Sequence, residues 1–196
     1  MKVQYYYRSD NVKHIIIAGA ARSGKTMMAL KLGQEGFVHY KMDSIKRGID
    51  NNFWGGYKDD WKKVSPHMAY LIKTIIDENQ SDIVKNKEFY CIDTCHIYPR
   101  DIAKYNLKNT IIVFMGYCDI KINDKLQNIR KYDIGTWSSL RNDEDLRNDT
   151  KLDIEYSKEA KKQCEELGIK FFDTSINFEQ TLYDIYKYIK TELDKE

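Results

Sequence analysis

The segment GAARSGKT, from Gly19 to Thr26, is the feature that most constrains how this chain can fold. It matches the pattern G-x-x-x-x-G-K-[S/T] at every fixed position, and this pattern is typical of a loop whose backbone wraps a phosphate group. The apolar run HIIIA precedes it, as in a buried strand, and MMALKL follows it, as at the start of a helix. A phosphate in such a loop meets the free N–H groups of the helix N-terminus. The sequence therefore predicts a nucleoside triphosphate site rather than a chance turn.

Different residues of this loop have different expected roles in nucleotide binding. Lys25 can reach the β- and γ-phosphates, so we expect it to be catalytic, and the hydroxyl of Thr26 can ligate Mg²⁺. The expected nucleotide-binding residues are Gly19, Ala20, Ala21, Arg22, Ser23, Gly24, Lys25, Thr26 and Met27.

Length and charge narrow the class of protein. A chain of 196 residues suits one domain with a proper core. The net charge of +2, from 32 basic and 30 acidic residues, gives no general case for nucleic-acid binding. No apolar stretch approaches the length of a membrane span, and the N-terminus lacks the apolar core of a signal peptide. We therefore expect a cytoplasmic location, with neither a membrane nor a nucleic acid as partner.

The cysteines allow two interpretations. Cys91, Cys95, Cys118 and Cys164 are expected to be reduced thiols rather than a disulfide framework. Cys91, Cys95 and His96 lie close enough in sequence to raise a zinc site, but their spacing fits no standard pair and a fourth ligand is missing. We therefore expect buried, inert thiols and a structural histidine.

Strand and helix patterns alternate along the chain, which predicts an α/β fold. The expected strands are 13–18, 37–42, 88–93, 110–115 and 169–172. The expected helices are 25–34, one capped by Ser65, 119–131, 152–167 and one capped by Asn177. This order predicts a three-layer sandwich around a five-stranded parallel sheet, with ligands at the carboxyl ends of the strands.

On these features the chain resembles the small P-loop kinases, the nucleotide, shikimate and related small-molecule kinases of the P-loop nucleoside triphosphate hydrolase superfamily. The resemblance extends to uncharacterised bacterial members of that group. The loop at 19–26, an aspartate after the second strand, a helical insertion and an arginine-bearing segment after the fourth strand carry it. No N-K-x-D signature of a guanine-specific GTPase is present, nor the D-G-[F/Y]-P-R segment of adenylate kinases.

The resemblance implies ATP as donor, Mg²⁺ as cofactor and phosphoryl transfer to a hydroxyl or phosphate of a nucleoside, nucleotide or sugar-like acceptor. It implies a single domain over 1–196, with an acceptor-binding insertion at about 44–87 and a lid at about 130–150. The acceptor would be the partner, and the chain would be a monomer or homodimer.

Site roles on the acceptor side also follow from the resemblance. Asp43 is the expected carboxylate that orients or deprotonates the acceptor, and the alternative is a helix-capping aspartate. Arg47 would hold an acceptor anion, and Trp54 would stack on the acceptor; the alternatives are a solvated arginine and a packing aromatic. Asp93 would bind on the substrate side and organise the metal together with Thr26.

The charged segment after the fourth strand supplies the lid cations. Arg130 and Arg141 are the expected catalytic arginines, which would stabilise charge on the transferring phosphate. The alternative is a solvated loop of mutually compensating charges.

Two other functions fit the same motif. The first is a nucleotide-binding switch or regulatory ATPase read by a protein partner. The second is a zeta-toxin-like nucleotide-sugar kinase, which also fits the loop and Asp43.

Overall fold

The computed structural model describes residues 13–49, 60–80 and 88–195, and its centre is a parallel sheet of five strands. The strands are β1 (His14–Gly19), β2 (Val38–Lys41), β3 (Tyr90–Thr94), β4 (Thr110–Gly116) and β5 (Lys170–Asp173). Their order is β2-β3-β1-β4-β5, and each neighbouring pair is parallel. The fold class predicted from the sequence is confirmed.

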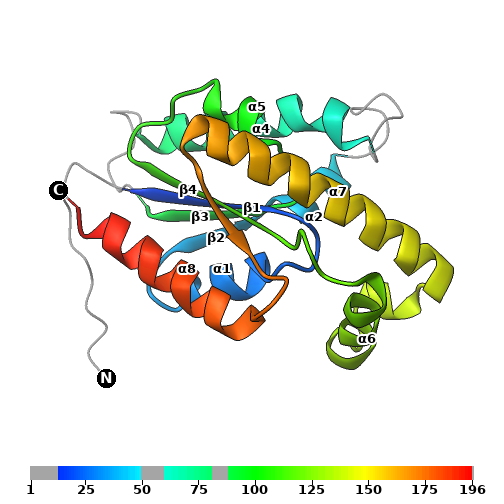
Figure 1. Cartoon of the computed structure of the whole chain (residues 1–196). Coiled ribbons are helices and arrows are strands. Elements are labelled where there is room, and N and C mark those ends of the chain that lie inside the picture. Colours follow the sequence, from blue (N-terminus) through cyan, green and yellow to red (C-terminus); the bar gives the residue numbers. More distant parts are fainter. Residues whose placement is uncertain (1–12, 50–59, 81–87, 196) are drawn as a thin grey trace.

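Helices cover both faces of this sheet. They are α1 (Lys25–Gly33), α2 (Met42–Gly48), α4 (Trp61–Gln80), α5 (Pro99–Ala103), α6 (Ile122–Tyr132), α7 (Asp143–Leu167) and α8 (Phe178–Leu193), with a 3₁₀ turn at Trp137–Leu140. Figure 1 shows α4, α5 and α7 above the sheet and α1 and α8 below it. Among the described residues, no helix has the length and apolar composition needed to cross a membrane.

The alternation of side chains along β1 divides the core into two layers. Ile16 and Ala18 pack toward α4 and α7, whereas Ile15 and Ile17 pack toward α1 and α8. Successive side chains of a strand point to opposite faces, so a central strand that is covered twice must be apolar throughout. The fully buried run from Ile15 to Ala18 meets this requirement.

Helix α4 begins earlier than the sequence pattern predicted. Ser65 was the expected cap, but α4 starts at Trp61 and contains Pro66. The carboxylate of Asp60 accepts the backbone N–H of Lys62 at 3.2 Å and so caps the first turn. The Ser65 hydroxyl instead lies between two other elements, accepting the Tyr98 N–H at 2.7 Å and donating to a carboxylate at the start of α5.

Two boundaries after β4 also differ from the expectation. Helix α6 starts at Ile122 instead of 119, and α7 starts at Asp143 instead of 152. The side chain of Asn142 caps α7 by accepting the Asp145 N–H at 2.8 Å. Three acidic residues in the first turn of α7 suit the positive end of its dipole. The start of α7 was not recognised in the sequence because its first two turns are rich in charged residues and have little apolar periodicity.

Candidate active site

The loop between β1 and α1 has a backbone shape that only glycine allows at its first position. Gly19 has φ 134° and Gly24 has φ 98°, both in the region that favours glycine. A Cβ on Gly19 would lie 1.8 Å from the carbonyl oxygen of Met115, its register partner on β4. Gly24 is the N-cap of α1, so the first-turn N–H groups of α1 are available to an anion in the loop.

Lys25 opens helix α1 within this loop. Its side chain is buried, and Nζ donates to the carbonyl oxygen of Ala20 at 2.6 Å. The ammonium group therefore lies inside the arc of the loop. This is the place from which a loop lysine neutralises phosphate oxygens.

Thr26, in the first turn of α1, contacts Asp93 of β3. The hydroxyl of Thr26 donates to Oδ2 of Asp93 at 2.7 Å, and Asp93 is only 1% exposed. Nε2 of His39, on β2, lies 3.4 Å from the same carboxylate oxygen. Hydroxyl and carboxylate oxygens are the ligands that Mg²⁺ prefers. The two residues that the sequence nominated as metal ligands are thus adjacent, and the chemistry of their side chains fits the ion.

Asp43 lies in the first turn of α2, and its carboxylate points to the end of β3. Oδ1 lies 3.1 Å from Nδ1 of His96 and accepts the backbone N–H of Cys95 at 3.3 Å. Lys41 is the N-cap of α2, so the capping alternative for Asp43 does not hold. Burial opposes the charge of this carboxylate, but His96 and Lys25 outweigh burial and hold the pKa of Asp43 well below its usual range.

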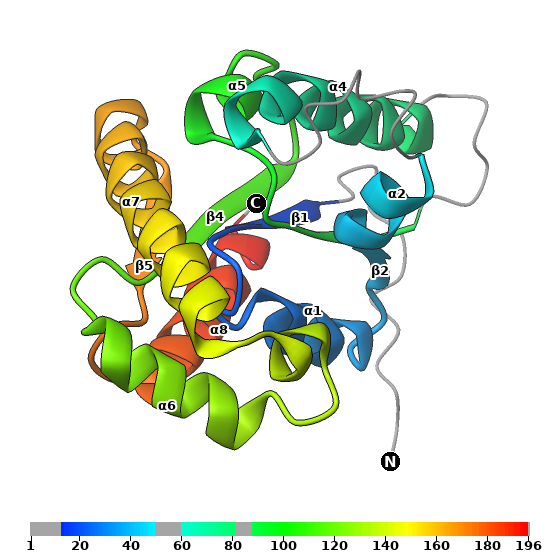
Figure 2. The ribbon, with the colours of Figure 1, turned by 90° about the vertical axis from the view of Figure 1, so that its right-hand side faces the viewer.

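A second polar network lies on the opposite side of the loop from α2. Figure 2 shows α6 and α7 on one side of the loop and α2 on the other. Asp153 of α7 accepts from Nη2 of Arg22 at 3.2 Å and from the hydroxyl of Tyr117 at 2.8 Å. That hydroxyl is also 3.0 Å from the carbonyl oxygen of Ala21. Lys125 of α6 donates to the carbonyl oxygen of Arg22 at 2.9 Å. Two helices are therefore tied to the phosphate loop.

Burial shifts the pKa values of two charged residues in this network, Lys125 and Asp153. Burial, reinforced by the charge of Arg22, lowers the pKa of Lys125 to about 8. Burial also raises the pKa of Asp153, which is 3% exposed. The lowered lysine pKa marks a place where an added negative charge is favoured. A phosphate chain in the adjacent loop would supply that charge.

The two arginines predicted for the lid point to acidic side chains of α7. Arg130 pairs with Asp143, with Nη2 2.6 Å from Oδ1. Arg141 lies 3.3 Å from a carboxylate oxygen of Asp149, and Arg130 and Arg141 are both exposed. Residues five apart on a helix point about 140° from each other, so Arg130 cannot share the direction of Lys125. The catalytic role of the two arginines stays a prediction.

Of the two other residues expected to contact the acceptor, Arg47 is described by the structure and Trp54 is not. Arg47 is exposed on α2, and its Nε donates to the backbone carbonyl of Asp43 at 3.2 Å. This contact is to the backbone of α2 and not to the Asp43 carboxylate, so the role of Arg47 in holding an acceptor anion stays a prediction. Trp54 lies outside the described residues.

Sequence reasoning missed Lys125, Asp153, Tyr117 and His39. Tyr117 carried a usable signal, because it directly follows β4 and so lies at the carboxyl edge of the sheet. Lys125 and Asp153 carried none, since each is one charged residue among many on a polar helix. Their burial appears only when α6 and α7 pack beside the loop.

The strand order and the glycine loop between β1 and α1 give the chain a P-loop fold, and this fold is similar to that of solved small-molecule kinases. Shikimate kinase from Acinetobacter baumannii, solved in complex with shikimate, is similar to the structure with a TM-score of 0.55. The match covers 95% of this chain and 97% of that one, at 13% sequence identity. Shikimate kinase from Bacteroides thetaiotaomicron matches with a TM-score of 0.49 and 12% identity, over 91% of this chain and 98% of that one. No protein-family model matches the sequence, and the search of curated proteins finds no relative.

Proposed function

We propose that this protein is an ATP- and Mg²⁺-dependent kinase that transfers a phosphoryl group to a hydroxyl or phosphate of a small molecule. The acceptor would be a nucleoside, a nucleotide or a sugar-like compound. It would be the protein's partner, and no nucleic acid or membrane enters the reaction. We further propose that the protein is cytoplasmic and acts as a monomer or homodimer.

One observation carries this proposal: the hydroxyl of Thr26, the loop residue that follows Lys25, lies 2.7 Å from the buried carboxylate of Asp93. Phosphoryl transfer needs a lysine on the terminal phosphates and oxygen ligands for the metal that accompanies them. Thr26 and Asp93 would hold Mg²⁺, which neutralises phosphate charge when bound. The backbone N–H groups of the loop and the α1 N-terminus would hold the phosphates.

Asp43 is our candidate for the carboxylate that orients the acceptor hydroxyl. It lies beyond β2, on the edge of the sheet that carries the phosphate loop, and its lowered pKa keeps it ionised at neutral pH. A positioned carboxylate can accept the hydroxyl proton as the new bond to phosphorus forms. We assign the insertion at about 44–87 to acceptor binding and the segment at about 130–150 to a lid, with Arg130 and Arg141 as its cations.

Lys125 and Arg22 are additional candidates for stabilising charge on the phosphates. Lys125 Nζ already lies at the loop, 2.9 Å from the Arg22 carbonyl oxygen. Asp153 fixes the guanidinium of Arg22 at 3.2 Å. Fixed cations in a water-poor site stabilise developing phosphate charge without reorganising during the reaction.

The test is ADP production by the purified protein with Mg-ATP, across pools of nucleosides, nucleotides, sugars and small hydroxy acids. We expect slow hydrolysis without an acceptor and a rise of at least about tenfold with one pool, since a kinase site excludes water when it closes on its substrates. Lys25→Ala should abolish the stimulated rate and keep the fold, which circular dichroism checks.

Two results would count against the proposal. Equal turnover by Lys25→Ala and the unaltered protein would show that the loop is not the site. Measurable ATP binding without stimulation by any pool would favour a nucleotide-dependent switch instead.

A further inference from the structure

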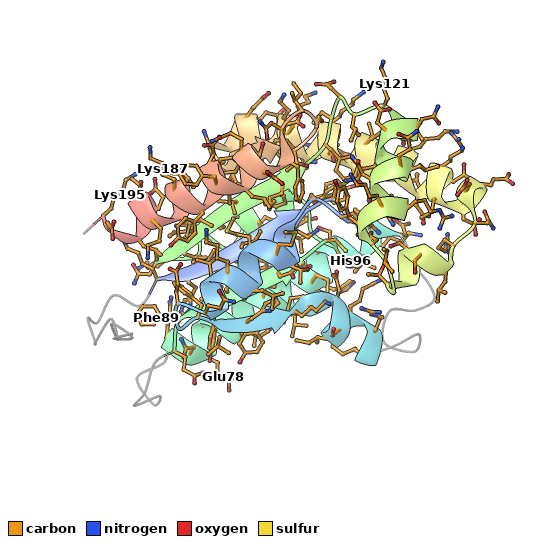
Figure 3. All side chains as sticks on the ribbon, turned by 90° about the horizontal axis from the view of Figure 1, so that it is seen from below. Glu78, Phe89, His96, Lys121, Lys187 and Lys195 are labelled. Atoms are coloured by element: carbon orange, nitrogen blue, oxygen red, sulfur yellow. The ribbon has the colours of Figure 1, made fainter. Side chains whose placement is uncertain are left out.

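The strand register brings three potential metal ligands together at the end of β3. Lys41 of β2 is the register partner of Asp93 of β3. Asp43 and Cys95 each follow two residues later, and His96 comes next. His96, labelled in Figure 3, lies just past the end of β3 and beside α2. The cluster therefore follows from the pairing of two parallel strands.

The ligand atoms form a compact triangle. Sγ of Cys95 lies 3.3 Å from Oδ1 of Asp43 and 3.1 Å from Nδ1 of His96. The third side, from Nδ1 of His96 to Oδ1 of Asp43, is 3.1 Å. Zinc bonds of about 2.0–2.3 Å in tetrahedral geometry place ligand atoms about 3.3–3.6 Å apart. A shift of a few tenths of an ångström would open the triangle into one face of a zinc tetrahedron.

The donor set selects the kind of cation. Sulfur, imidazole nitrogen and carboxylate oxygen suit a borderline-soft ion such as Zn²⁺, whereas Mg²⁺ prefers oxygen alone. The Thr26–Asp93 pair offers oxygen and no sulfur, with the imidazole of His39 3.4 Å away, so the thiol of Cys95 is what distinguishes the two clusters. Cys95 is 7% exposed, whereas the side chain of Asp43 is 27% exposed, so the cluster is closed at the sulfur and open at the carboxylate.

We propose that Asp43, Cys95 and His96 form a site for a thiophilic divalent cation of the Zn²⁺ class. A water or an acceptor atom would complete the coordination, as in sites with three protein ligands. The Cys95 thiol loses its proton to solvent as the metal–sulfur bond forms. Bound Zn²⁺ would withdraw Asp43 from the acceptor and so inhibit transfer; this second part rests on the proposed function, whereas metal binding does not.

The sequence alone raises a different set, Cys91, Cys95 and His96, and favours buried, inert thiols instead. Cys91 was one of its members, but Cys91 packs on the α1 and α8 face of the sheet. Cys95 and His96 lie beyond the end of the same strand, where Asp43 approaches them from another strand end. The tertiary fold therefore puts Asp43 in the place of Cys91, and the set still has three protein ligands.

Metal binding is tested without nucleotide. Zn²⁺ is titrated into the reduced protein in competition with a chromophoric chelator, and Co²⁺ is titrated to detect a thiolate-to-cobalt charge-transfer band. We expect one tight site per chain and a cobalt–thiolate band. In Cys95→Ser and His96→Ala, the affinity should fall by about 100-fold or more and the band should be lost or weakened.

Cys118→Ser is the matched control. Cys118 is also buried beside a carboxylate, since its backbone N–H donates to Asp173 at 3.3 Å, but in sequence it has no histidine neighbour. Its replacement should leave the affinity for Zn²⁺ unchanged. Binding that is unchanged in Cys95→Ser, or that shows no cobalt–thiolate band, would overturn the metal site.

A separate measurement tests inhibition. Zn²⁺ at saturating concentration should lower the acceptor-stimulated rate of the unaltered protein, with Mg-ATP in excess. Each variant is compared with its own metal-free rate, so a lower basal rate of Cys95→Ser does not matter. Tight Zn²⁺ binding with no loss of rate would refute the inhibitory role and leave the metal site standing. Zinc binding by a protein that no acceptor stimulates would overturn the proposed kinase function and not the metal site.

Discussion

Lys125 is a charged residue in a place where burial opposes its charge. Its ammonium is faced by the cations of Arg22 and Lys25 and by the carboxylates of Asp153 and Asp133. Burial and the nearby positive charges lower its pKa to about 8. Below that pH Lys125 is a cation at the phosphate loop, and above it the loop loses one positive charge.

We therefore predict that ATP binding weakens as pH rises through about 8. A charged hydrogen bond contributes about 1.5–3 kcal/mol, so the loss of charge should raise the Kd by roughly tenfold or more. Isothermal titration calorimetry between pH 6.5 and 9.5 measures this. Lys125→Arg should bind with little change over the same range, because arginine stays protonated. An identical pH profile for Lys125→Arg would contradict the assignment.

Asp43 gives a second prediction at the scale of one residue. Asp43→Asn keeps the shape of the side chain and removes the charge that accepts the acceptor's proton. We expect kcat with the stimulating acceptor to fall by roughly 100-fold or more, the range of a lost general base. The Kd for ATP should change far less. An equal loss of both would indicate a structural role, and thermal unfolding of the variant provides the check on folding.

Among the elements, the phosphate loop depends most directly on one close approach. Gly19 and Gly36 both have positive φ, 134° and 101°. A Cβ would lie 1.8 Å from the Met115 carbonyl oxygen at Gly19, whereas nothing lies within 4 Å at Gly36. Substitution of Gly36 therefore tests backbone strain alone, whereas substitution of Gly19 tests backbone strain together with steric overlap.

Gly19→Ala should cost clearly more stability than Gly36→Ala. Alanine with positive φ costs about 1–2 kcal/mol in either place. At Gly19 the β1–β4 contact must also shift, so we expect an additional loss of at least about 2 kcal/mol in the free energy of unfolding. Urea unfolding of both variants measures the difference. Equal losses would mean that β1 and β4 separate at no cost at this point.

In helices α6 and α7, tertiary packing decides which charged residues lie at the phosphate loop. The charged residues between 130 and 150 suggested a loop, yet the capped helix α7 begins within them. Lys125 and Asp153 are then brought to the phosphate loop, while Arg130 pairs with Asp143. The direction of each side chain around its helix decides which cations reach the site.

At the scale of the whole molecule, one buried histidine couples folding to pH. His14, fully buried at the start of β1, lies next to Asn79 of α4 and accepts the Tyr90 N–H of β3 through Nδ1 at 3.3 Å. Burial lowers the pKa of His14 from 6.5 to about 4. The folded state therefore favours neutral His14, and protonation would remove the acceptor of the Tyr90 N–H.

This lowered pKa predicts the direction of the pH effect on stability. The contribution of neutral His14 is complete above about pH 6.5, where the unfolded histidine is neutral as well. It is lost as pH falls toward about 4, by up to about 3 kcal/mol, because the unfolded state then binds a proton that the folded state resists. His14→Asn should flatten this part of the pH profile in urea unfolding. His67→Asn, on the exposed side of α4, should not; matching profiles for the two variants would contradict the assignment.

The sequence alone determined the features that depend on near neighbours in the chain. The glycine loop, the five strands and the Asn177 cap of α8, which accepts the Gln180 N–H at 3.1 Å, follow from local patterns and are present in the structure. Thr26 and Asp93 could be paired in advance because residues past parallel strands share one edge of the sheet. Hydrophobic periodicity and turn chemistry operate over a few residues, which is why they can be recognised without a structure.

The tertiary structure decided which distant side chains meet. The β2–β3 register places Asp43 against Cys95 and His96, and the packing of α6 and α7 places Lys125 and Asp153 at the loop. No local pattern encodes these contacts, because a strand does not specify its neighbour and a helix does not specify the face that its partner covers. Sheet order and helix packing result from burying the whole core at once, and they bring together the groups on which both proposals rest.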